Sequence, residues 1–142
     1  MMKDKSINIL LVEDDEVDVM NVQRAFKKNH ILNPLYVAGN GLEALAMLHG
    51  DGVEKIVPMP KIILLDINMP RMNGIEFLQK LRTEPELKAI CIFVLTTSSD
   101  DRDKIAAYDL NVAGYILKPV ELDNFIEAVK TMDLYWSLLE LP

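Results

Sequence analysis

The chain has 142 residues, of which 15 are Lys or Arg and 22 are Asp or Glu, and half of its residues are apolar. This balance is typical of one folded domain and not of a disordered chain, and the net charge of -7 disfavours non-specific binding to nucleic acid. One cysteine forms no internal disulfide, and the apolar run near the N-terminus is too short for a signal peptide or a membrane span. We therefore expect a single cytoplasmic domain over residues 1–142, without a membrane segment.

Short apolar runs alternate with amphipathic stretches along the chain. Runs rich in Ile, Leu and Val that are apolar on both faces are typical of buried strands in a parallel sheet. Five such strands are predicted, at Ile7–Val12, Leu35–Ala38, Ile62–Leu65, Ile90–Leu95 and Gly114–Leu117.

Helical patterns separate these runs. After the first run, Val19, Val22 and Phe26 are spaced for one face of a helix, and Asp14 or Asp15 would cap its start. Strands that alternate with helices predict an α/β fold with right-handed crossovers and helices on both faces of the sheet. Residues 49–60 contain two Gly and two Pro and are predicted to form an extended loop. The other predicted helices are Leu42–Leu48, Ile75–Arg82, Arg102–Leu110 and Leu122 to about Leu139.

Polar groups follow four of the five predicted strands. In an open parallel sheet, ligands bind beyond the carboxyl ends of the strands, so these groups are expected to meet at one edge. Acids held this close repel one another, and a divalent cation relieves the repulsion; carboxylate and carbonyl oxygens suit Mg2+. Zinc is not indicated, since Cys91 is alone and the two histidines lie elsewhere. The strand-end groups are Glu13-Asp14-Asp15, Asp66, Thr96 to Ser99, and Lys118.

With a cation bound, the same edge attracts phosphoryl oxygens. Lys118 supplies a positive charge there, and the Thr96 hydroxyl is a hydrogen-bond donor. Asp66 is then a carboxylate nucleophile, and carboxylates are covalent phosphoryl acceptors. A cation, a lysine and a hydroxyl together stabilise the charge on a phosphoryl group in transfer.

Several of these residues also have a purely structural explanation. An Asp after a strand is more often a helix cap than a nucleophile, and we favour the cap for Asp15. Thr96 suits the end of a strand without any function. Cys91 is expected to be an inert buried thiol, and His49 is expected to lie in a loop with nothing nearby in sequence to orient it.

Four motifs, in this order and spacing, resemble the receiver domain of two-component response regulators over nearly the whole chain. The resemblance implies a flavodoxin-like fold, a doubly wound five-stranded parallel sheet of strand order 2-1-3-4-5 with five helices. The loop at 49–60 and the lack of an output domain are similar to stand-alone regulators associated with bacterial and cyanobacterial phytochromes. The motifs are Leu-Leu-Val-Glu-Asp-Asp (10–15), Leu-Leu-Asp-Ile-Asn-Met-Pro-Arg-Met-Asn-Gly (64–74), Val-Leu-Thr-Thr (94–97) and Gly-Tyr-Ile-Leu-Lys-Pro (114–119).

The resemblance implies a role for each matching position in the metal and phosphoryl site. Asp66 is the expected phosphoacceptor, forming a 4-aspartylphosphate, and it also binds Mg2+. Asp14 is expected to bind Mg2+ directly, Glu13 through water, and Asn68 through its backbone carbonyl. Lys118 is expected to pair with a phosphoryl oxygen.

The resemblance also implies a switch. Thr96 is the expected switch hydroxyl and Tyr115 the aromatic residue that changes rotamer with it. Asn68 and Ser98 occupy positions that, in that family, tune the lifetime of the acyl phosphate, and the Lys118-Pro119 bond is expected to be cis. This sequence departs from the usual pattern at Thr97, where Ala or Gly is common, and in the longer loop at 49–60.

The expected function is that of a signalling phosphoprotein, not a turnover enzyme, although it catalyses its own phosphoryl transfer and dephosphorylation. The expected partners are a sensor histidine kinase, with a phytochrome as the specific candidate, and a downstream protein. The apolar tail at about 134–142 predicts a homodimer through the last helix, and the alternative is that the tail folds back onto its own domain.

Two other functions share parts of this pattern. A Mg2+-dependent phosphatase of the haloacid dehalogenase type also uses a strand-end Asp, but it needs a second acid where Asn68 stands. A flavodoxin-like cofactor binder needs a Ser, Thr or Gly loop after the first strand, where Glu13, Asp14 and Asp15 would repel phosphate.

Overall fold

The computed structural model describes residues 7–28, 31–69, 71–96 and 110–118. Its sheet has five parallel strands in the order β2-β1-β3-β4-β5, which confirms the predicted fold class and strand order. The strands are β1 Ile9–Val12, β2 Leu35–Ala38, β3 Ile62–Asp66, β4 Cys91–Thr96 and β5 Gly114–Leu117.

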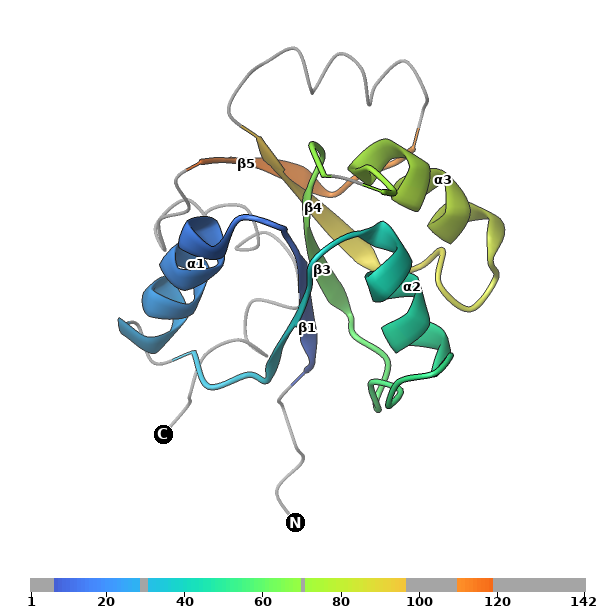
Figure 1. The fold of residues 1–142 in the computed structure, drawn as a ribbon, viewed down its shortest axis with the longest axis horizontal. Helices are drawn as coiled ribbons and strands as arrows, with labels where there is room; N and C mark the ends of the chain where they lie inside the picture. Colours follow the sequence, from blue (N-terminus) through green and yellow to red (C-terminus); the bar gives the residue numbers. More distant parts are fainter. Residues whose placement is uncertain (1–6, 29–30, 70, 97–109, 119–142) are drawn as a thin grey trace.

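Three helices lie within the described residues, and they cover both faces of the sheet (Figure 1). They are α1 Glu16–Lys28, α2 Gly41–His49 and α3 Gly74–Thr83. Helix α1 covers one face, and α2 and α3 cover the other. The predicted helix at 122–139, the tail at 134–142 and nearly all of the predicted helix at 102–110 lie outside the described residues. No helix in the described ranges is long and apolar enough to cross a membrane.

The sheet has a separate hydrophobic core on each face, because successive side chains of a strand point to opposite sides. On the α1 face, Ile9, Leu11 and Phe93 pack with Val22 and Phe26 of the helix. On the other face, the alternate residues of the same strands pack against α2 and α3. Strands β1 and β3 are therefore buried on both sides, which explains why their sequences are almost continuously apolar.

The prediction that His49 lies in a loop was wrong. His49 is the last residue of α2, and Gly50, whose φ of 78° suits a glycine, caps the helix. The imidazole Nε2 of His49 lies 2.6 Å from Glu84 Oε1, at the end of α3, so long-range contacts orient this side chain. The bounds of β2 and β5 match the prediction, and the bounds of the other described strands and of α2 and α3 differ from it by at most two residues, which is usual at the ends of elements.

A glycine fixes the loop that follows β3. A Cβ at Gly74 would lie 2.7 Å from the backbone oxygen of Asp66 and 2.7 Å from Ile67 Cα, so a side chain cannot fit without moving the end of β3. The Gly74 amide donates to the Ile67 carbonyl at 2.9 Å, and Asn73 and Glu76 form a capping box at the start of α3. The close return of α3 onto β3 holds Asp66 at the edge of the sheet.

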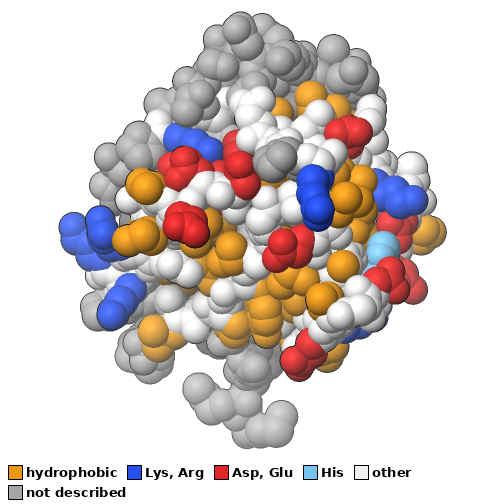
Figure 2. Space-filling view, viewed as in Figure 1, with side chains coloured by type: hydrophobic (Ala, Val, Ile, Leu, Met, Phe, Trp, Pro, Cys, Tyr) orange, Lys and Arg blue, Asp and Glu red, His pale blue; other side chains and the backbone are white. Residues whose placement is uncertain are grey.

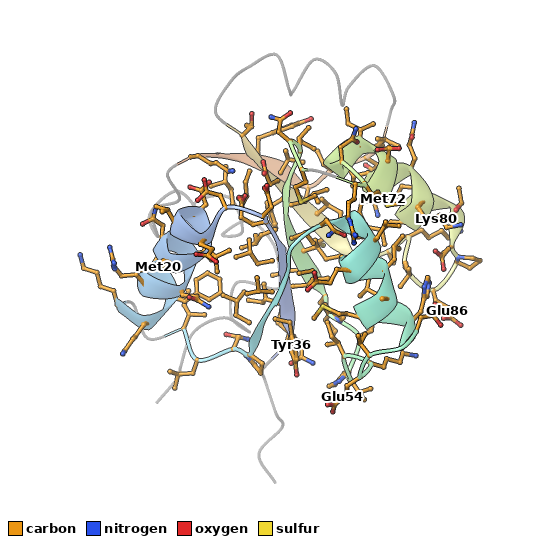
Figure 3. All side chains as sticks on the ribbon, in the orientation of Figure 1. Met20, Tyr36, Glu54, Met72, Lys80 and Glu86 are labelled. Atoms are coloured by element: carbon orange, nitrogen blue, oxygen red, sulfur yellow. The ribbon has the colours of Figure 1, made fainter. Side chains whose placement is uncertain are left out.

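The start of α2 packs equally closely against the same loop. A Cβ at Gly41 would lie 2.8 Å from Met72 Cγ, and the Gly41 amide donates to the Met72 carbonyl. Figure 3 shows Met72 beside the upper end of α2. The loop after β3 is thus supported by helices on both of its sides.

Arg82 ties α3 to the segments that precede β4 and β5. Its guanidinium donates to the carbonyl oxygens of Leu110 and Asn111 at 2.9 Å and to that of Lys88 at 2.6 Å. Cys91, at the start of β4, is half-buried and not fully buried as predicted. Its partial burial raises the pKa of the thiol, and the charge of the nearby Arg82 partly offsets the rise. This anchor fixes the strands whose far ends carry Thr96 and Lys118.

Candidate functional site

The carboxyl ends of β1, β3, β4 and β5 surround one open pocket of about 260 Å³. This is the sheet edge at which the sequence predicted a site. Figure 2 shows acidic side chains beside a basic one on this side of the molecule, above α1 and near the end of β5. The pocket is lined by Glu13, Asp14, Asp15, Asp18, Asp66, Asn68, Thr96 and Lys118.

Asp15 serves as the N-cap of α1. Its Oδ1 accepts hydrogen bonds from the amides of Val17 at 2.8 Å and Asp18 at 3.3 Å, which satisfies donors that the first helical turn leaves free. The structural explanation favoured for Asp15 is therefore correct. Glu13 and Asp14 precede the cap and remain available for the pocket.

Lys118 lies at the centre of the acidic side chains. Its Nζ is 2.8 Å from Glu13 Oε1, 3.0 Å from Asp18 Oδ2 and 3.2 Å from Asp66 Oδ1. The lysine is held from its backbone as well, because its amide donates to the Thr96 carbonyl at 2.9 Å. Carboxylates from α1 and from the ends of β1 and β3 thus meet at the ammonium group of Lys118, which directly follows β5.

This arrangement shifts the pKa values of Glu13 and Lys118. Burial, together with the charge of Asp66, raises the pKa of Glu13 to about 7, although Lys118 opposes the rise. Burial lowers the pKa of Lys118, but its contacts with Glu13, Asp18 and Asp66 outweigh burial and raise it overall. The lysine is therefore a fixed positive charge at neutral pH.

The carboxylates fit a divalent cation. Glu13, Asp14 and Asp66 each offer an oxygen, and these oxygens lie within 4.8 Å of one another. Glu13 Oε1 is buried and, within the described part of the chain, has only the ion pair with Lys118 and no hydrogen bond of good geometry. This buried carboxylate oxygen of Glu13, together with the nearby carboxylate oxygens of Asp14 and Asp66, suits Mg2+, which prefers oxygen ligands. Asn68 lines the same pocket, and its backbone N–H donates to Asp66 Oδ1 at 3.4 Å.

The two expected switch residues lie on neighbouring strands. Thr96 is buried at the end of β4 and lines the pocket. Tyr115 is in β5, opposite Val94 in the register, and packs against the core on the α2 and α3 face. Thr97, Ser98 and Pro119, with the expected cis bond, lie outside the described residues.

Sequence reasoning missed Asp18. The residue lies in the first turn of α1, three positions after the cap, and its carboxylate reaches Lys118. A signal was present, because the first turn of a helix that follows a strand lies beside that strand's carboxyl end. An acid in that turn therefore faces the same sheet edge as the strand-end acids.

A family model for the response regulator receiver domain matches residues 9–130 of the chain. Among curated proteins, Response regulator Rcp1 of Synechocystis sp. is 38% identical over 128 residues, which cover 90% of this chain and 87% of that protein. The Mn2+-bound form of Rcp1 has been solved and superposes with a TM-score of 0.70 at 35% identity, over 96% of this chain and 99% of the other.

Two further solved structures are similar over almost all of this chain. A two-component response regulator from Legionella pneumophila is 44% identical, with a TM-score of 0.76 over 94% of this chain and 98% of that one. The phosphorylated cyanobacterial phytochrome response regulator RcpA is 33% identical, with a TM-score of 0.76 over 96% and 99%.

These findings decide between the functions that the sequence left open. They agree with a receiver domain that has a signalling role, and they give no support to the haloacid dehalogenase type of phosphatase. The acidic cluster and the Mn2+-bound relative agree with the predicted divalent-cation cofactor.

Proposed function

The chain belongs to the response regulator receiver domain family, and on this basis we propose that Asp66 accepts a phosphoryl group from a sensor histidine kinase. The observation that carries the proposal is the position of Asp66 beside Lys118 in a pocket lined with acids. Asp66 is buried except where it faces this pocket. A phosphodonor therefore reaches its carboxylate from the pocket side.

In the proposed step, an Asp66 carboxylate oxygen attacks the phosphorus atom of a phosphohistidine. The new O–P bond forms as the N–P bond breaks, and the electron pair of that bond returns to the imidazole of the kinase. Lys118 stabilises the charge spread over the phosphoryl oxygens, and the Thr96 hydroxyl donates to one of them. The same groups would serve when water removes the phosphoryl group, so the domain catalyses both reactions on itself.

Glu13, Asp14, Asp66 and the backbone carbonyl of Asn68 are the groups that would hold Mg2+. When bound, the cation offsets the charge of the acids and of the incoming phosphoryl oxygens. The carboxylate cluster and the buried oxygen of Glu13 support this assignment.

The proposed output is a change in protein–protein contact. Phosphorylation adds roughly two negative charges beside Lys118 and Thr96. Thr96 then moves toward the phosphoryl group, and Tyr115 changes its packing on the neighbouring strand, as a shift between two populated conformations. The partner in this proposal is a downstream protein, and a homodimer through the last helix remains a prediction.

We place the docking site of the kinase on α1. The transfer is proposed to take place in the cytoplasm. Val17 and Met20 are exposed apolar residues on this helix, whose first turn forms one wall of the pocket. Figure 3 shows Met20 on the outer side of α1. The likeness to a phytochrome response regulator makes a phytochrome-type histidine kinase the first candidate.

Phosphotransfer from autophosphorylated kinases tests this proposal. A radiolabelled phytochrome-type kinase should pass its label to the wild-type protein within minutes, and Met20→Lys should slow that transfer. The same Met20→Lys protein should react with acetyl phosphate at the wild-type rate, because a small donor needs no docking surface. The proposal fails if no histidine kinase in a broad panel labels the wild-type protein.

A further inference from the structure

We propose that Asp18 is a positioning residue that restrains Lys118 and so limits how strongly this ammonium group acts on a phosphoryl group at Asp66. An ammonium group has three N–H donors, and Lys118 has three carboxylates within 3.2 Å, those of Glu13, Asp18 and Asp66. Each donor therefore already has an acid beside it before any phosphoryl group arrives. The inference rests on the proposed function, because it concerns the role of Lys118 in that reaction.

Asp18 differs from the other two acids in what phosphorylation does to it. Glu13 and Asp66 belong to the cluster that fits a cation, which would offset their charge, and the carboxylate of Asp66 is itself converted to an acyl phosphate. Asp18 is not in that cluster and keeps its full charge 3.0 Å from the ammonium. It is thus the acid that still competes for Lys118 with the phosphoryl oxygens.

The position of Asp18 is set by α1 and not by the ends of β3 and β4, which carry Asp66 and Thr96. Its amide donates to the Asp15 cap, and its carboxylate approaches Lys118 from the first turn of the helix. The side chain of Asp18 is 23% exposed and that of Lys118 is 12% exposed, so the pair is partly shielded from solvent. Asp18 therefore keeps restraining Lys118 while other parts of the pocket rearrange.

Neutralising Asp18 should therefore release Lys118 and speed phosphorylation. Asp18→Asn keeps the shape of the side chain and removes its charge. We expect phosphorylation by acetyl phosphate to be about two- to fivefold faster, the size of effect expected for a partly exposed ion pair. Asp18→Glu, which keeps the charge, should return the rate toward wild type.

Asp15→Asn is the matched control. Asp15 lines the same pocket as Asp18 and directly precedes the same helix. Its substitution by Asn therefore also removes one negative charge from this end of α1. Asn is as good an N-cap as Asp, and in the described part of the chain Asp15 is not an ion-pair partner of Lys118. An effect that comes only from reduced repulsion of the anionic donor would appear equally in both variants.

The experiment measures phosphorylation rates of wild type, Asp18→Asn, Asp18→Glu and Asp15→Asn with Mg2+ and acetyl phosphate. A second readout, on the metal-free proteins, is the 1H–15N signal of the Lys118 ammonium group. That signal should shift or broaden in Asp18→Asn and stay in place in Asp15→Asn. If Asp18→Asn does not fold, Asp18→Ser, which also suits the first turn of a helix, replaces it.

The outcomes separate this inference from the proposed function. Equal rates in Asp18→Asn and Asp15→Asn, a slower Asp18→Asn, or an unchanged Lys118 signal would overturn the restraint. A wild-type protein that takes up no phosphoryl group would instead overturn the proposed function. Wild-type phosphorylation with a selective gain in Asp18→Asn supports both.

Discussion

Protein carrying Asp66→Asn should keep its unmodified mass after incubation with Mg2+ and acetyl phosphate, whereas the wild-type protein should gain one phosphoryl group. The amide of Asn is a far weaker nucleophile than a carboxylate, and it cannot form the acyl phosphate. Intact-protein mass spectrometry measures both results in one experiment. The adduct on the wild-type protein should also be labile to base, as an acyl phosphate is.

Asp51→Asn is a suitable control for that experiment. Asp51 has an 80% exposed side chain in the loop after α2, and its substitution removes one negative charge away from the pocket. This variant should gain the phosphoryl group as the wild type does. An adduct of equal yield in Asp66→Asn would show that another residue is the acceptor.

Lys118→Met should slow phosphorylation by roughly 10²- to 10³-fold, which is the usual cost of removing one group that stabilises developing charge in a transition state. Met keeps most of the apolar stem, so the change removes mainly the ammonium. Its loss also leaves Glu13, Asp18 and Asp66 without their shared cation partner in the described pocket. The rate of adduct formation at saturating acetyl phosphate measures the effect.

Lys80→Met serves as the matched control, since Lys80 is exposed on α3 and does not line the pocket (Figure 3). It should react at the wild-type rate. A Lys118→Met protein that reacts within threefold of wild type would remove the lysine from the proposed mechanism.

The fold could be predicted from the sequence because its strongest signals are local. Residues such as Ile63 and Leu64 form runs apolar on both faces, and only a sheet covered by helices on both sides buries such runs. The positions of the strand ends then follow from the topology of a parallel sheet, which brings Glu13, Asp66 and Lys118 to one edge. The orientation of the His49 side chain could not be predicted locally, because its partner Glu84 is 35 residues away in sequence.

The details of the site could not be predicted in the same way. Asp18 looks like an ordinary acid in the first turn of a helix, a position that the helix dipole favours without any function. Its contact with Lys118 joins residues 100 positions apart and depends on how α1 lies against β5. The raised pKa of Glu13 likewise comes from burial and from Asp66, neither of which is a property of the local sequence.

The proposed phosphoryl transfer depends most directly on one divalent cation shared by Glu13, Asp14 and Asp66, and isothermal titration calorimetry with Mg2+ measures whether that cation binds. We predict one Mg2+ per chain, with an affinity that falls at least about tenfold in Asp14→Asn. The same titration of Glu16→Gln, which neutralises a neighbouring exposed acid that does not line the pocket, should match wild type. A wild-type protein that binds no Mg2+, or an Asp14→Asn protein that binds it as tightly as wild type, would contradict the account.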